Sequence, residues 1–211
     1  PSMTFGTHRQ TKLDLAEEVL AGLGALLRRR GDRLGTMATT RGELDVVRPP
    51  RGDRRGIIAA IAAVRAVGRQ QSEGRTDLAR AVTTVGRLAR HRGAVVVMSD
   101  FPRQEGLELA LGTLARRHEV VAVEIRDPRE RDLPDVGLVH LRDVETGERK
   151  MVDTADPRFQ ERFAAVAAEA DRERASMLAR VGARHVVVET GSDWVLPLAR
   201  ALDRPQRRRA S

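Results

Sequence analysis

The chain of 211 residues contains no cysteine, no tyrosine and a single tryptophan, and only 2% of its residues are aromatic. Without cysteine, disulfide scaffolds, cysteine-based zinc sites and thiol nucleophiles are excluded. No stretch is apolar for the roughly 18 residues that a membrane helix needs, and the start lacks a basic-then-apolar signal pattern. We therefore expect a soluble, cytoplasmic protein, and the length is typical of one large domain.

Positive charge is in excess. The sequence holds 38 lysine and arginine residues against 30 acids, giving +8, and only two of the 38 are lysines. Four arginines lie within residues 204–211, which contain no acid, so the remainder carries +4 (8 − 4). Such an excess suggests nucleic acid or another polyanion as a ligand. The scarcity of aromatic side chains argues against base stacking. Binding of nucleic acid or a polyanion through this arginine-rich tail, which we expect to be disordered, remains the alternative function.

The spacing of apolar residues predicts alternating helices and strands. Helices are predicted over 11–30, 53–68, 77–91, 105–117, 157–181 and 194–202. Short apolar runs typical of strands buried on both faces lie at 94–98, 120–125 and 186–188. Two hairpins are also predicted, from strands at 33–40 and 43–48, which Pro49 and Pro50 end, and from strands at 138–142 and 149–153. We predict an α/β fold, a three-layer, doubly wound and mostly parallel sheet, over residues 1–203, with a hairpin inserted at about 127–154.

Polar residues follow the predicted parallel strands. Ser99 and Asp100 end one strand, Asp127 follows the next, and Glu189 with Thr190 follows the last. Ligands of open parallel sheets gather at the carboxyl ends of the strands. Oxygen ligands without cysteine favour a hard cation such as Mg²⁺. An aspartate at a strand end can equally cap the following helix, so these positions alone leave metal binding open.

Short motifs in a characteristic order resemble a known family. They are Pro1–Thr7 with Lys12, then 31–35, 74–78, 95–101 and the segment 127–148. Together they resemble the von Willebrand factor A-like family, specifically its domain-of-unknown-function 58 branch of bacterial proteins. The resemblance implies a Rossmann-like sheet whose first strand, ending in Asp-x-Ser, precedes Pro1. That strand would lie in the centre of the sheet, between the strands predicted at 33–40 and 94–98.

The resemblance also implies a metal-ion-dependent adhesion site. Its ligands to Mg²⁺ or another divalent cation would be Ser2, Thr76 and Asp100. Two hydroxyls, one carboxylate and water leave such an ion short of ligands, so an acidic side chain of a partner can complete the shell. Ser99 and the pair Asp127 and Glu130 could support the site from outside the ligand set.

Simpler interpretations of three of these residues stay open. Thr76 could cap the helix predicted to begin at Asp77. Asp127 and Glu130 could instead lie in a solvated turn held by Pro128, and this is the interpretation that we favour. The five histidines show no metal-ligand spacing and are expected at surfaces or interfaces, whereas Trp194 is expected to pack in the core or between helices.

The resemblance implies a protein-interaction module, an adaptor or chaperone-type partner of a MoxR-type AAA+ ATPase. The chain has no Walker A motif, so ATP hydrolysis would belong to the partner. No nucleophile–base pair and no Gly-x-Ser-x-Gly elbow are present, and we expect no enzymatic activity. A hydrolase would require a mechanism that the sequence does not offer.

Overall fold

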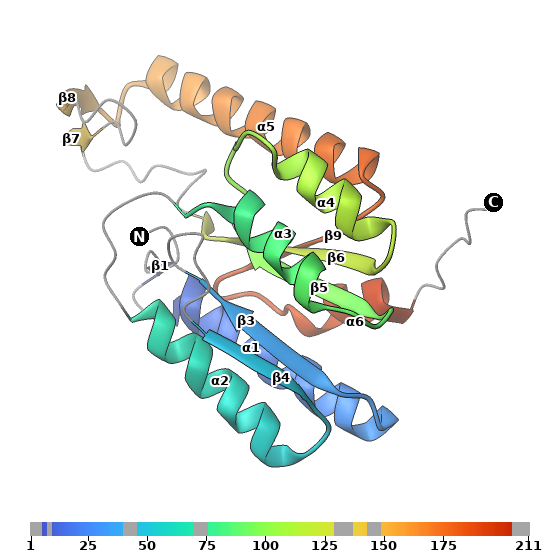
Figure 1. Cartoon of the computed structure of the whole chain (residues 1–211). Helices are drawn as coiled ribbons and strands as arrows, with labels where there is room; N and C mark the ends of the chain where they lie inside the picture. The colour runs from blue at the N-terminus through green and yellow to red at the C-terminus, as the bar shows by residue number, and fades with distance from the viewer. Residues whose placement is uncertain are drawn as a thin grey trace.

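The computed structural model describes residues 6–7, 10–39, 46–69, 76–128, 137–142 and 149–203 (Figure 1). The helices and strands are, in chain order, β1 (Gly6–Thr7), β2 (Gln10–Thr11), α1 (Lys12–Arg30), β3 (Leu34–Ala38), β4 (Val46–Arg51), α2 (Arg54–Gly68), α3 (Leu78–Leu88), β5 (Ala94–Ser99), α4 (Leu107–Ala115), β6 (Glu119–Arg126), β7 (Leu138–Arg142), β8 (Arg149–Asp153), α5 (Pro157–Arg180), β9 (Arg184–Glu189) and α6 (Val195–Asp203). The prediction of a mixed α/β fold is confirmed. Within these ranges, no helix combines the length and apolar character that crossing a membrane requires.

A three-stranded parallel sheet forms the centre of the molecule. Its strand order is β5-β6-β9, with β6 paired on both sides. Val121, Val123 and Ile125 of β6 pack against α1 and α6, whereas Val120 and Ala122 face α3, α4 and α5. Helices therefore cover both faces of this sheet (Figure 1). Because β6 has a neighbour on each edge and helices on each face, its apolar run is fully buried.

Strand β5 is less buried than its sequence predicts. We expected the run 94–98 to be buried on both faces, but Val95 to Ser99 are only partly buried and Ala94 is exposed. β5 pairs with β6 on one edge, and no strand of the described ranges pairs with the other. β3 and β4 likewise pair only with each other there, as an antiparallel hairpin. The single doubly wound sheet that we predicted is therefore divided into two sheets within the described ranges.

The two prolines lie inside β4, so the prediction that they end the hairpin was wrong. Leu34 pairs with Arg51 and Thr36 with Arg48, and the register shifts between these pairs. Pro49 and Pro50 fall at this irregularity, on the outer strand of the hairpin. A missing N–H is tolerated at a bulge or on an edge strand, which explains why the strand continues through them.

Helix α1 has clear start and packing signals. Asp14 N donates to Thr11 Oγ1 at 3.1 Å, and Thr11 N donates to Asp14 Oδ2 at 2.9 Å, which is a capping box. Trp194 packs against the helix where Gly22 provides space, since a Cβ there would lie 2.5 Å from the indole. The predicted packing role of Trp194 is confirmed. Lys12, the first helical residue, is fully buried and was singled out only through the resemblance.

The predicted insertion is present as the β7–β8 hairpin. Its strands pair in antiparallel register, from Leu138 opposite Asp153 to Arg142 opposite Arg149. Thr154 Oγ1 closes its base by donating to the Gly137 carbonyl at 2.8 Å. The hairpin lies beside the first residues of α5 (Figure 1). Ser2, Glu130 and the tail 204–211 lie outside the described residues.

Candidate functional site

A tight turn presents Asp100 at the carboxyl end of β5. Phe101 N donates to Ser99 Oγ at 3.0 Å, and Ser99 Oγ donates to Asp100 Oδ1 at 3.2 Å. Phe101 is buried and has φ of +47°, a left-handed conformation that is uncommon for a residue other than glycine. Strained backbone of this kind costs about 1–3 kcal/mol and clusters at functional sites. The turn leaves the Asp100 side chain partly exposed.

Gln104 links this turn to the start of α3. Leu78 N and Ala79 N donate to its Oε1 at 2.9 and 3.2 Å. Its Nε2 donates to the carbonyl oxygen of Thr76 at 3.3 Å. One side chain on the loop after β5 therefore satisfies free amides of the helix and holds the backbone at Thr76. Thr76 and the loop that begins at Asp100 thus lie at the same edge of the sheet, and the sequence analysis missed Gln104.

The capping alternative for Thr76 is not what the structure shows. Asp77 is the N-cap of α3, and its Oδ1 accepts from Arg80 N at 2.8 Å. The helix begins at Leu78, one residue later than the alternative supposed. Asp77 lies where its side chain reaches the amide three residues on, as an N-cap requires, and Thr76 lies one position before it.

Asp127 is not solvated, so the favoured interpretation of this residue was wrong. Its side chain is 1% exposed, and Thr190 Oγ1 donates to its Oδ2 at 2.9 Å. Thr190 N also donates to the Arg126 carbonyl at 3.0 Å. The ends of β6 and β9 are therefore tied together. Parallel pairing brings Asp127 beside Thr190, a contact that separation along the sequence did not indicate.

Next to this site, Glu124 is the centre of a buried charge cluster that the sequence analysis missed. Its Oε1 accepts from Arg126 Nε at 2.5 Å and from Arg174 Nη1 at 2.6 Å, and its Oε2 lies 2.6 Å from His185 Nε2. Asp171 Oδ1 lies 2.8 Å from Arg174 Nη1 and 3.2 Å from Arg126 Nη2. The cluster joins β6, β9 and α5. A buried acid within an apolar strand, two residues before an arginine, was the available signal.

Electrostatics favour the ionised form of Glu124. Burial by itself would raise the pKa of this carboxyl group, whose side chain is 1% exposed. The hydrogen bonds from His185 and Arg126, with the positive charges of Arg174 and Arg126, outweigh burial and hold the pKa below its usual value of 4.5. Glu124 is therefore a carboxylate that balances two guanidinium groups.

The charge cluster also contacts the strained turn. Arg174 Nε donates to the carbonyl oxygen of Phe101 at 3.3 Å. α5 therefore holds the turn from one side, while Gln104 ties the same loop to α3 on the other. Asp100, which is partly exposed, directly precedes these two fixed points of the loop.

Two histidines, His118 and His185, are largely buried. His118 is 5% exposed, and its Nε2 has no hydrogen-bond partner among the described residues. The expectation of a surface or interface position is wrong for this residue. His185 contacts Glu124 as described, and its side chain is 19% exposed.

The contacts described above place some of the candidate metal ligands, but not all of them. Thr76 and Asp100 lie at one edge of the molecule, and Asp127 ends the neighbouring strand of the same parallel sheet. Ser2 and Glu130 lie outside the described ranges. Among the side chains that are described, no group of three or more His, Asp or Glu is arranged to hold a metal ion. The candidate set has one carboxylate and two hydroxyls, so it is a different kind of site.

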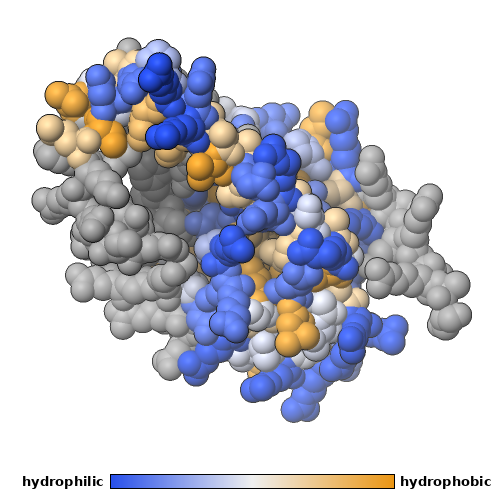
Figure 2. All heavy atoms as spheres, turned by 90° about the horizontal axis from the view of Figure 1, so that it is seen from above, coloured by the Kyte–Doolittle hydropathy of each residue, from blue (hydrophilic) through white to orange (hydrophobic). Residues whose placement is uncertain are grey.

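The surface hollows of the structure lie elsewhere. One, of about 340 Å³, is lined by Ile58, Ile61 and other side chains of α2. A second, of about 460 Å³, lies at the start of α5 around Phe159. Seen from above, the surface is mostly hydrophilic with scattered apolar side chains (Figure 2). The turn at Asp100 therefore presents a side chain at an edge and does not line either hollow.

Comparison with known proteins identifies relatives over nearly the whole chain. The family described as "Protein of unknown function DUF58" matches residues 1–174. The uncharacterized protein Rv1480 of Mycobacterium tuberculosis and Mb1516 of Mycobacterium bovis are each 33% identical over 199 residues, 94% of this chain. The chain spans 62% of the length of these two relatives. The uncharacterized protein MAV169 of Mycobacterium avium is 38% identical over 126 residues, 60% of this chain and 74% of that protein.

Solved structures are similar in fold. The conserved hypothetical protein BatB from Bacteroides thetaiotaomicron aligns over 95% of this chain and 90% of its own, with a TM-score of 0.59 and 17% identity. An aerotolerance-related membrane protein from Bacteroides fragilis aligns over 94% and 90%, with a TM-score of 0.58 and 15% identity. At these identities the likeness concerns the fold. The family match and the mycobacterial relatives together establish that this chain belongs to the DUF58 family of proteins of unknown function.

Proposed function

We propose that this chain is a metal-dependent protein-interaction module with a von Willebrand A-like fold. The observation that carries the proposal is the turn Ser99–Phe101, which presents a partly exposed carboxylate on strained backbone. The loop is held on one side by Arg174 and on the other by Gln104. Strain that the surroundings enforce at a strand end is expected where a side chain must be presented in one orientation.

The donor set fits a hard divalent cation. Asp100, Thr76 and Ser2 would hold Mg²⁺ through oxygen atoms, and Asp127 would support the site from the end of the neighbouring strand. When bound, the ion would bridge to an acidic side chain of a partner and thereby make recognition metal-dependent. The residues of this chain orient the ligands: Ser99 donates to Asp100, and Gln104 holds the backbone of Thr76.

A further parallel strand between β3 and β5 is part of the same proposal. Within the described ranges, β5 has no neighbour on one edge and the β3–β4 hairpin is separate; both therefore offer strand edges to a neighbour and support it. Val95 to Ser99 are half-buried where a central strand would be fully buried, as β6 is. Such a strand would join the two sheets into one, and, as the resemblance implies, its carboxyl end would carry Asp-x-Ser ligands beside Asp100.

The proposed partner is a MoxR-type AAA+ ATPase, for which the chain would act as adaptor or chaperone-type component. This part rests on the sequence motifs that resemble the von Willebrand A-like family. The module would have no catalytic step of its own, and ATP hydrolysis would take place on the partner. Recognition by a metal-bridged carboxylate requires only binding at the edge of the sheet.

Metal titration of the full-length protein tests this function. Mn²⁺ binding, followed by electron paramagnetic resonance and calorimetry with Mg²⁺ as competitor, should be lost in Asp100→Ala while thermal unfolding is unchanged. Glu105→Ala is the matched control, because Glu105 is an exposed acid on the same loop, and it should bind as the parent protein does. Equal metal affinity in the two variants would overturn the metal site.

A further inference from the structure

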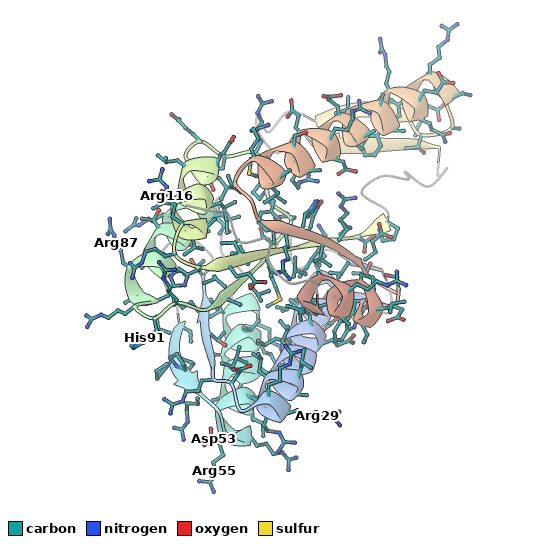
Figure 3. All side chains as sticks on the ribbon, turned by 90° about the vertical axis from the view of Figure 1, so that its right-hand side faces the viewer. Arg29, Asp53, Arg55, Arg87, His91 and Arg116 are labelled. Atoms are coloured by element: carbon teal, nitrogen blue, oxygen red, sulfur yellow. The ribbon has the colours of Figure 1, made fainter. Side chains whose placement is uncertain are left out.

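The edge of the molecule opposite the candidate metal site carries a dense set of arginines. Strands β5, β6 and β9 begin at this edge, and α1, α3 and α4 end there (Figure 1). Figure 3 views the molecule from this side and shows Arg29, Arg55, Arg87 and Arg116 projecting outward from four different helices or their ends. We define the arginine face as seven exposed residues: Arg28, Arg29, Arg54, Arg55, Arg87, Arg92 and Arg116.

The charges of this face are poorly compensated. Within the described part of the chain, none of its seven members has an ion pair or another polar partner. The nearby acids Asp53 and Glu119 are already paired, with Arg51 at 2.8 Å and with Arg184 at 2.6 Å. Asp32 is exposed, adjoins the arginines that end α1, and is one acid against seven guanidinium groups. The face therefore keeps a strong local positive charge.

Helix dipoles explain only part of the arginine face. Cations stabilise a helix at its carboxyl end, which accounts for Arg28, Arg29 and Arg87 in the last turns of α1 and α3. Arg54 and Arg55 occupy the first turn of α2, which holds no acid after its Asp53 cap. At that position the dipole opposes positive charge. The helix dipole therefore does not account for Arg54 and Arg55, whose charges add to the arginine face at a small cost to their own helix.

The arginine-rich tail is attached on the same side. α6 ends at Asp203 near this edge, and the sequence after it contributes four more arginines (Figure 1). The chain therefore leaves its described part at the edge that carries the arginine face. A broad ligand with many phosphates matches this distribution better than a small anion does.

We propose that the arginine face binds the surface of an anionic phospholipid bilayer. Guanidinium groups bind phosphate oxygens in pairs of hydrogen bonds, and each basic residue near an anionic membrane adds about 1 kcal/mol of attraction. Leu26 and Leu88 lie near arginines of the face in sequence and are 37% and 49% exposed, so aliphatic groups accompany the charges into the headgroup layer. None of the seven members is adjacent to a phenylalanine or tryptophan in sequence, which disfavours single-stranded nucleic acid as the ligand. The proposal is independent of the metal site.

Vesicle co-sedimentation tests this inference with the whole 211-residue chain. The protein should pellet with vesicles of phosphatidylcholine containing phosphatidylglycerol, should not pellet with phosphatidylcholine alone, and should be released by moderate salt. The variant R29E/R87E/R116E should bind at least about 100-fold more weakly, since each of the three charges contributes about 1 kcal/mol and 1.4 kcal/mol is a factor of ten. The control R103E/R158E/R162E changes net charge equally at exposed positions on the loop after β5 and on α5, and its binding should fall much less.

Folding of both triple variants is checked by thermal unfolding, and R29Q/R87Q/R116Q replaces the reversal variant if that variant unfolds early. Equal loss of binding in the face and control variants would overturn the proposal, because attraction would then follow net charge alone. It would also be overturned if deletion of 204–211 abolished binding while the face variant bound normally. Tighter binding to a short DNA duplex than to the anionic vesicles at the same salt would assign the face to nucleic acid instead.

Discussion

The two edges of the parallel sheet use charged and polar residues in opposite ways. At the carboxyl edge, Ser99, Gln104 and Asp127 are engaged in hydrogen bonds that fix the loops, and the buried Glu124 balances two half-buried arginines. At the amino edge, the arginines of the arginine face are exposed and have no described partners. At the carboxyl edge, the polar side chains therefore hold the loops and strands together. At the amino edge, the arginines of the arginine face are available to a ligand.

Removing the carboxylate of Glu124, at the carboxyl edge, should have the largest effect on the free energy of unfolding. Glu124→Ala leaves the half-buried guanidinium groups of Arg126 and Arg174 with Asp171 as their remaining acid, so we expect a loss of about 3 kcal/mol in the free energy of unfolding. Urea denaturation at neutral pH measures it. Glu169→Ala is the control, because its pair with Arg172 is exposed, and should change stability little. Similar effects in the two variants would mean that the buried cluster has no special role.

Acid should remove the contribution of Glu124 to the free energy of unfolding. The pKa of Glu124 is lowered from 4.5, so the folded state releases this proton more readily than the unfolded chain does. Its stabilising contribution is therefore fully present above about pH 4.5 and is lost as pH falls through the folded-state pKa. Urea midpoints at neutral and acid pH should show a smaller acid-induced loss in Glu124→Gln than in the parent protein. An identical pH dependence would show that Glu124 does not titrate in this range.

Breaking the link between α3 and the loop after β5 should have an intermediate effect on the free energy of unfolding. Gln104→Ala removes the acceptor of two helix amides, and we expect a loss of about 1–2 kcal/mol in the free energy of unfolding. The same variant should weaken Mn²⁺ binding in the full-length protein, since Thr76 is no longer held beside Asp100. Loss of stability with unchanged metal affinity would separate the structural contact from the site.

The smallest predicted effects concern the amino edge, and they have opposite signs. Arg55→Glu places an acid in the first turn of α2 and should stabilise the protein by about 0.3–1 kcal/mol. Arg29→Glu places an acid in the last turn of α1 and should destabilise it by a similar amount. Thermal unfolding of the two variants measures the difference. If both substitutions destabilise, the first-turn arginines are held by the fold and not kept for a ligand.

Much of the fold could be predicted from local sequence signals. The helix limits at α1 follow from its cap and the glycine after it, and the hairpin β7–β8 has the predicted strands. At the candidate site, the sequence indicated Asp100 and Ser99 as residues of a strand end. Gln104, Glu124 and Arg174 were not indicated, because each has partners that lie 25 to 73 positions away along the chain. Such contacts depend on which strand ends become neighbours.

The order of apolar and polar residues by itself determined the helices and strands, because each depends on neighbours only a few residues apart. The composition alone determined the excess of positive charge. Tertiary structure alone decided that β5 pairs on one edge only among the described strands, that Asp127 is buried against Thr190, and that arginines from four helices share one face. The physical reason is that burial, strand pairing and local charge density depend on which segments meet in space.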